Sequence, residues 1–338
     1  MPKVKPGRSG QRFILPLLVL LTLVLIAAIG DLAVGARFIA PLTVFQALTD
    51  YQPTLFSHHI IVDLRLIRVV AALLVGAALG VAGALLQSVI RNPLGEPHIL
   101  GLNAGAALAV VLCTTLGHWV SSPELRPLVA ACGAALLFSL VIAFSSAGRT
   151  GLTIVKVTLC GVALSAFASS LTATILLLDE QTMIEIRTWL TGDLSALSWS
   201  VIATASALAA GATLLAASQA PSLNTLALGD RMAVGLGVNL RRTRVLTIVA
   251  IALLSGAAVS VAGPIGFVGL IVPAIARRVV SDDLRLSLPY CALIGGLIML
   301  LADIAARTLL APQEVATGIM TALAGAPLFI LLAAKVFK

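Results

Sequence analysis

Long apolar blocks separated by short polar segments are the feature that most constrains this sequence. Most of the blocks reach the roughly 20 residues that an α-helix needs to cross a bilayer. Backbone N–H and C=O groups find no water in lipid, so blocks of this length must satisfy those groups as helices. The sequence therefore predicts an all-α polytopic membrane protein with about ten transmembrane helices. The expected spans are 13–35, 68–89, 98–117, 127–147, 152–178, 196–218, 245–263, 265–276, 286–310 and 318–336.

Composition agrees with this fold class. Hydrophobic residues make up 59% of the chain and charged residues only 11%, far from the balance of a soluble domain. Small-residue pairs such as Gly76 and Gly80, or Gly101 and Gly105, predict helices that approach one another closely. No internal repeat or low-complexity linker divides the chain, so we expect one transmembrane domain over 1–338.

The basic residues indicate how the chain is oriented. With the N-terminus in the cytoplasm, 16 Lys and Arg residues fall inside and 6 outside, as the positive-inside rule requires. This predicts that both termini are cytoplasmic and that the first span is an uncleaved helix. The formal charge of +8 lies between spans, with no basic run interleaved with aromatic residues, so membrane lipid is the expected contact and nucleic acid is not.

The eighth block is too short to span alone. As a helix, residues 266–276 would reach only about 17 Å. Basic residues at 241–244 and at 277–278 both favour the cytoplasmic side. The chain must therefore cross the membrane outward and then back again between them. Pro264, Gly266, Gly269 and Pro273 then predict irregular backbone that packs against neighbouring helices or lines a cavity.

The polar, basic stretch 223–244 is the longest interruption between apolar blocks in the second half of the chain. It predicts a short helix, a glycine break and a second short amphipathic piece at the cytoplasmic surface, with Asp230 placed to help cap a helix. The chain carries no G-x-x-x-x-G-K-[ST] loop, no H-E-x-x-H and no nucleophile elbow. We therefore expect a transport subunit that receives energy from another protein, and no enzyme.

Nothing in the sequence predicts a metal site or a cofactor. The four cysteines lie singly in apolar runs and are typical of small hydrophobic packing residues. His98 and the neighbouring pair His58 and His59 lack converging ligands.

Three segments resemble the permease subunits of the iron-siderophore and cobalamin ABC importers, the FecCD type. Within Gly76 to Gly105, the residues from Gln87 to Gly101 follow the family signature Q-x-x-x-x-N-P-L-A-x-P-x-x-L-G, with Gly95 in place of its alanine. The second segment is AGPIGFVGLIVP, from Ala262 to Pro273. The third comprises LADIAAR at 301–307, EVATGI at 314–319 and GAPLF at 325–329. The resemblance covers nearly the whole chain in order.

The resemblance implies a type II importer with defined partners. Such permeases pair with a second permease, either the same chain or a paralogue, and are driven by two cytoplasmic ATPase subunits. They receive substrate from an extracytoplasmic binding protein and lie in the bacterial inner membrane. By resemblance, the coupling helices that seat in the ATPase fall at about 222–238, and the residues implied in coupling are Leu226, Leu228, Gly229, Asp230, Leu236 and Gly237.

The resemblance also implies an outer docking site and an inner gate. Arg65, Arg68 and Arg307 match positions that dock acidic residues of the binding protein; alternatively, Arg307 pairs with Asp303 four residues earlier on the same helix. The residues that narrow the cytoplasmic end of the pathway are Asn92, Leu94, Thr153, Ile154 and Val155. Asn92 is alternatively a turn residue that bonds backbone through its side chain.

Some positions depart from the family pattern. Ala274 stands where the family has a histidine after Pro273, and Ile67 replaces a proline between the two docking arginines. Val315, Ala316 and Thr317 replace the usual Leu-Pro-Val. These departures bear on gating near those positions and not on the fold.

The leading hypothesis is a permease that moves a ferric siderophore into the cytoplasm. Cobalamin or haem import by the same family is the main alternative. Two rivals come from other classes. One is a proton-coupled secondary transporter, with Asp303 or another buried carboxylate as its proton site, and the other is an intramembrane enzyme.

Overall fold

The computed structural model describes residues 11–35, 37–116, 123–147, 153–195 and 197–336. Within these residues, seven helices are long and apolar enough to cross a membrane. They are α1 (Gln11–Ala33), α4 (Leu66–Ile90), α6 (Arg126–Ser146), α7 (Ile154–Leu178), α9 (Trp199–Leu226), α11 (Leu240–Ala262) and α13 (Leu284–Thr308). The apolar helices α5 (Leu102–Leu116) and α14 (Thr317–Val336) and the 12-residue α12 (Val268–Val279) accompany them.

Each of the ten predicted spans corresponds to one of these ten helices, and the predicted all-helical membrane fold is confirmed. Some residues used in the charge count, namely the basic residues up to Arg8, Arg149 and Lys338, lie outside the described residues.

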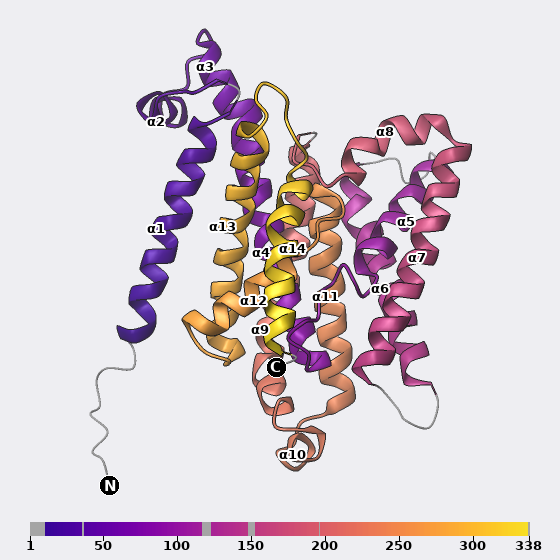
Figure 1. Cartoon of the computed structure of the whole chain (residues 1–338). Coiled ribbons are helices and arrows are strands. Elements are labelled where there is room, and N and C mark those ends of the chain that lie inside the picture. Colours follow the sequence, from indigo (N-terminus) through magenta and orange to yellow (C-terminus); the bar gives the residue numbers. More distant parts are fainter. Residues whose placement is uncertain (1–10, 36, 117–122, 148–152, 196, 337–338) are drawn as a thin grey trace.

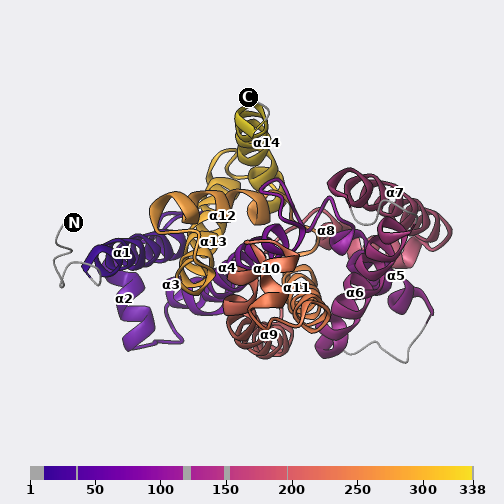
Figure 2. The ribbon, with the colours of Figure 1, turned by 90° about the horizontal axis from the view of Figure 1, so that it is seen from below.

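Short helices lie at the two ends of the bundle (Figure 1). At one end are α2 (Pro41–Thr49), α3 (Phe56–His59) and α8 (Glu180–Leu190); we call this the α8 end. A π-helical turn, Ile60–Arg65, joins α3 to α4, and a 3-10 turn, Pro123–Leu125, precedes α6. The opposite end, which we call the α10 end, carries the short helix α10 (Asp230–Gly235). Seen from that end, α10 lies near the middle of the molecule, while α1, α7 and α14 lie at its edges (Figure 2).

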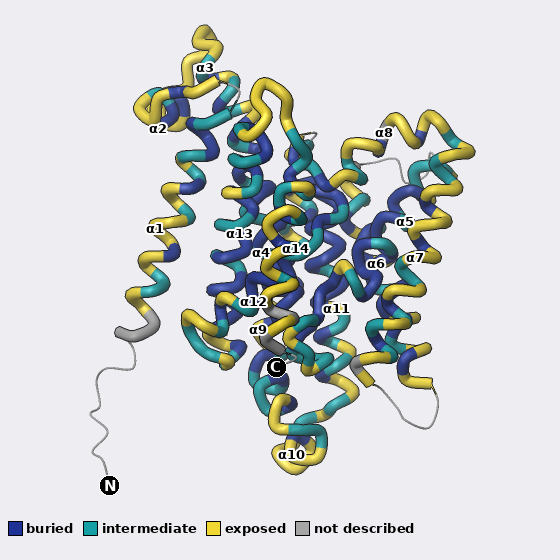
Figure 3. Tube along the Cα trace, viewed as in Figure 1, coloured by how far each residue is buried: buried dark blue, intermediate teal, exposed yellow. Residues whose placement is uncertain are grey.

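The central helix α4 is buried along most of its length (Figure 3). It packs on α13 at a crossing of two glycines, because a Cβ added at Gly76 would overlap the carbonyl of Gly295, and the reverse also holds. One turn further on, Gly80 meets the carbonyl of Cys291, and Gly105 of α5 meets Gly133 of α6 in the same way. The small-residue faces therefore bring helix backbones into direct contact.

The polar interruption is shorter than predicted. Helix α9 continues through Pro221 to Leu226, and α11 already begins at Leu240. The side chain of Asn224 explains the extension of α9, because it donates to Asp283 at 2.6 Å and accepts from the backbone of Leu284 at 3.0 Å. Between the two long helices lies one short helix, so the prediction of two short pieces is wrong. The predicted glycine break is present, because Gly229 and Gly237 on either side of this helix have positive φ.

The irregular backbone before α12 is held by buried polar side chains. Gly263 and Phe267 both have positive φ values, of 71° and 69°. The backbone N–H of Phe267 donates to the carboxylate of Glu96, and Asn103 donates to the carbonyl of Ile265 at 2.9 Å. This stretch thus satisfies its backbone groups against protein, as irregular backbone at membrane depth must.

Candidate functional site

The segment between α9 and α11 projects from the α10 end (Figure 1), and much of it is exposed (Figure 3). Gly229 and Gly237, with φ values of 107° and 84°, turn the chain into and out of α10. Leu228 and Leu236 are more than 60% exposed, whereas Leu226 ends α9 and is fully buried. Five of the six predicted coupling residues therefore lie in this projection, and Leu226 anchors it to the bundle.

Asp230 joins α10 to two long helices. It is the first residue of α10, and the preceding Gly229 provides no side-chain cap, so the predicted capping role of Asp230 is not seen. Its carboxylate instead pairs with Arg91, and with Arg244 of α11 at 2.8 Å. Partial burial raises the pKa of Asp230, but the hydrogen bonds from the two arginines outweigh it, and the pKa lies below its ordinary value. We call Asp230, Arg91 and Arg244 the clamp.

Through Arg91, the clamp reaches the turn that follows α4. Arg91 is the C-cap of α4 and has a left-handed backbone with φ 51°. The next residue, Asn92, accepts a hydrogen bond from the N–H of Leu94 through its side chain, at 3.0 Å. This bond is the turn role expected as the alternative for Asn92. A movement of α10 that carried Asp230 would therefore pull on the start of this turn.

The predicted gate residues lie in two neighbouring cavities. Asn92, Leu94 and Val155 line a cavity of about 370 Å³ together with Phe329 of α14. Thr153 instead caps α7, accepting from the N–H of Lys156 at 3.3 Å, and lines a cavity of about 690 Å³ beside Asp230. The side chain of Ile154 lies outside the described residues. Three of the five residues, from the turn after α4 and from α7, thus converge on one space.

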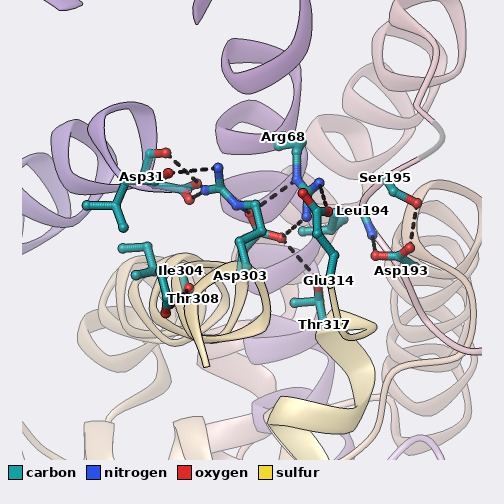
Figure 4. Close-up of polar contacts among 12 residues, drawn as sticks. Asp31, Arg68, Asp193, Leu194, Ser195, Asp303, Ile304, Thr308, Glu314 and Thr317 are labelled. Atoms are coloured by element: carbon teal, nitrogen blue, oxygen red, sulfur yellow. Dashed lines mark hydrogen bonds and ion pairs between the residues drawn. The ribbon is translucent and has the colours of Figure 1, made fainter. Parts of the chain in front are cut away.

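The three predicted docking arginines near the α8 end are buried. Figure 4 shows Arg68 in contact with Asp303 and Glu314. Arg68 spans two carboxylates, Asp303 at 2.9 Å and Glu314 at 2.8 Å. Arg307 pairs with Asp303 at 2.9 Å, the spacing expected from its own helix, and also with Asp31 of α1. These contacts join α1, α4, α13 and the segment before α14.

Almost none of the surface of the three predicted docking arginines is accessible to solvent. Arg65, Arg68 and Arg307 are 6%, 8% and 3% exposed, and Arg65 donates to the carbonyls of Leu32 and Arg37 at 2.6 Å each. Glu314 is the partly exposed member, with 43% of its side chain accessible. A docking partner could reach these guanidinium groups only if the network opened.

Several residues of these sites were not predicted from the sequence. Asp31 is the one acidic residue in the first apolar block, and its desolvation cost was the signal that it must have a cationic partner. Arg91 lies inside the family signature but carried no predicted role. Arg244 was counted only as an inside charge. Within the described residues, no group of three or more His, Cys, Asp or Glu side chains is placed to hold a metal ion.

Comparisons with known proteins find relatives along nearly the whole chain. The model of the FecCD transport family matches residues 20–335. The ferric enterobactin transport system permease protein FepD of Escherichia coli is 40% identical, over 93% of this chain and 93% of its own. The hemin transport system permease protein HmuU of Yersinia pestis is 36% identical, over 96% of both chains.

A solved structure has the same fold. It is an inward-facing conformation of a metal-chelate type ABC transporter, with a TM-score of 0.78 and 30% identity over 94% of this chain and 98% of that one. The family match and these likenesses extend over nearly all of the described helices. The chain therefore belongs to the FecCD transport family and is a permease subunit of an ABC importer.

Proposed function

We propose that this permease moves a ferric siderophore into the cytoplasm, using ATP hydrolysed by two separate ATPase subunits. The observation that carries the energy-receiving role is the clamp, because Asp230 connects the projecting α10 to the turn that lines the gate cavity. Rigid-body movement of a short helix is a common way to transmit a partner's conformational change.

The α10 end is the side that we assign to the cytoplasm. The positive-inside count supports this orientation, since Arg231, Arg241, Arg242 and Arg244 all lie at or beside α10. Helix α1 begins at this end and α14 runs toward it, which supports cytoplasmic termini in a bacterial inner membrane (Figure 1). The exposed leucines of the projection supply the apolar contact that an ATPase cleft would cover.

The remaining partners follow from the family. A substrate-binding protein would dock at the α8 end, and a second permease, the same chain or a paralogue, would complete the pathway. For docking through Arg68 and its neighbours, an acidic group on the binding protein would have to take the place of Glu314, whose carboxylate is the accessible member of that network.

A siderophore is the proposed substrate because a relative named for ferric enterobactin is 40% identical. A haem or cobalamin chelate is the alternative, since the relative named for hemin is nearly as similar. The structure gives less support to a proton-coupled transporter. Both oxygens of Asp303, the carboxylate that such a transporter would use, bind Arg68 or Arg307, which favours a structural role.

Reconstitution tests the proposal. The permease would be placed in proteoliposomes with its ATPase and binding protein and offered a ferric siderophore, haem and cobalamin in turn. We expect uptake of the siderophore only with both partners and ATP. Uptake driven by a proton gradient alone would contradict import by ATP hydrolysis, and preferential uptake of haem or cobalamin would contradict the siderophore assignment.

A further inference from the structure

A second cavity at the α10 end adjoins the gate cavity, with which it shares Ile90 and Thr158. It measures about 690 Å³ and lies between the ends of α4, α6, α7 and α11. This volume is within the range of small-molecule sites in proteins. Its wall contains the clamp and Arg241, the second residue of α11.

The charge of this wall is strongly positive. Three arginines, Arg91, Arg241 and Arg244, face one carboxylate, Asp230, which leaves a formal surplus of two positive charges. Arg91 and Arg244 each contact Asp230 through Nη2, and a guanidinium carries five N–H donors, so further donors are free to bind an anion. Within the described part of the chain, Arg241 has no hydrogen-bond or ion-pair partner. The wall can therefore accept a phosphate group, for which arginine is well suited.

Apart from Thr153 and Thr158, the rest of the wall is apolar. Its aliphatic side chains are Val89, Ile90, Ile142, Val157, Leu240, Val245 and Ile248. Val245 is 52% exposed, and one turn further into the membrane-spanning helix Val249 is 40% exposed. These two valines continue the aliphatic wall from the arginines along α11 toward the hydrocarbon region. A ligand that fits both parts has an anionic head and hydrocarbon chains.

We propose that this cavity binds the head group of an anionic phospholipid. The phosphate diester lies against Arg241 and the free donors of Arg244, and the acyl chains follow Val245 and Val249. Basic pockets between membrane helices on the cytoplasmic side bind anionic lipid head groups in this manner. A free phosphate would satisfy the arginines but leave the aliphatic wall uncovered, so the lipid is the better match.

Lipid titration of the purified full-length permease in neutral detergent tests the site. Thermal unfolding would be followed with phosphatidylglycerol, with phosphatidylcholine of the same chains, and with inorganic phosphate. We expect phosphatidylglycerol to raise the unfolding temperature at low concentration and the other two to leave it unchanged. Equal shifts with phosphatidylcholine would overturn a head-group site, and a full shift with inorganic phosphate would overturn the lipid.

Two variants with the same charge change locate the site. Arg241→Gln removes the unpaired arginine of the cavity. Arg242→Gln is the matched control, because this exposed neighbour does not line the cavity. We expect Arg241→Gln to weaken phosphatidylglycerol binding at least tenfold and Arg242→Gln to leave it unchanged. Native mass spectrometry, which counts retained lipids, supplies a readout that does not depend on unfolding temperature.

An equal loss of phosphatidylglycerol binding in the two variants would indicate a general attraction between charges and would overturn the site. The site would also be overturned if Arg241→Gln kept its lipid but lost association with the ATPase, because the cavity would then belong to a protein contact.

Discussion

Two aspartates in this permease each bind two arginines, but their surroundings give them opposite energetic roles. The side chain of Asp230 is 42% exposed, and that of Asp303 is fully buried. Exposed ion pairs stabilise by only about 0–1 kcal/mol. Removing one partner of a buried pair costs about 3–5 kcal/mol, because a charge is left without compensation. The Asp303 network therefore holds helices together, whereas the clamp can link moving parts without locking them.

The Arg68 network predicts a large stability effect. Arg68→Gln leaves Glu314 and part of Asp303 unpaired, and we expect it to lower the free energy of unfolding by about 3 kcal/mol or more. Thermal unfolding of the purified variant measures this. Arg187→Gln, which removes an exposed arginine of α8, serves as control and should change stability by less than about 1 kcal/mol. A similar small change in both variants would show that the network contributes little.

The lowered pKa of Asp230 predicts how the clamp responds to pH. A carboxylate whose pKa is lower in the folded state than in the unfolded state stabilises the fold at every pH above the unfolded-state pKa. This stabilisation is lost only as the pH falls toward and through the lowered folded-state pKa. The clamp should therefore stay intact from about pH 8 to about pH 5. The ratio of substrate transported to ATP hydrolysed, measured over this range, should not change through Asp230. A drop within the range that disappears in Asp230→Asn would contradict this.

At the scale of elements, the long helices were predictable and their ends were not. Apolar blocks identified all ten helices because each must satisfy its backbone in lipid. The end of α9 was misplaced by eight residues because Asn224 is fixed by Asp283, a contact 59 residues away that no local pattern contains. The position of α10 was within the predicted loop, but its extent depends on positive φ values at Gly229 and Gly237.

Gly229 offers a test of α10 as a moving element. Gly229→Pro cannot adopt the native φ of 107°, since proline fixes φ near −65°. A Cβ at this position meets no atom within 4 Å, so the long helices should fold normally while α10 is displaced. We expect ATP hydrolysis that no longer drives uptake.

Gly235→Ala is the matched control for this variant. Gly235 lies within α10, its φ is not positive, and its surroundings are equally open. It should keep normal coupling, and normal coupling in Gly229→Pro as well would count against a role for the position of α10.

At the scale of the whole molecule, the resemblance grouped residues from distant segments better than it predicted the partners of single residues. Asn92 and Leu94 come from the turn after α4 and Val155 from α7, and all three line one cavity. Arg65, Arg68 and Arg307 were predicted to dock acidic residues of the binding protein. The Arg307–Asp303 pair was the predicted alternative, but the partners Asp31 and Glu314 lie more than 240 residues from Arg307 and Arg68, beyond any helical spacing rule. Long-range ion pairing is the property that the sequence alone left undetermined.

The central claim is that Asp230 transmits the movement of α10 to the gate. The most direct measurement is the amount of substrate transported per ATP hydrolysed by the reconstituted complex, in the natural chain, in Asp230→Asn and in Asp282→Asn, an exposed control. We predict that Asp230→Asn keeps its ATP hydrolysis and its fold but transports at least tenfold less substrate per ATP, while Asp282→Asn is unchanged. An unchanged ratio in Asp230→Asn would contradict transmission through Asp230.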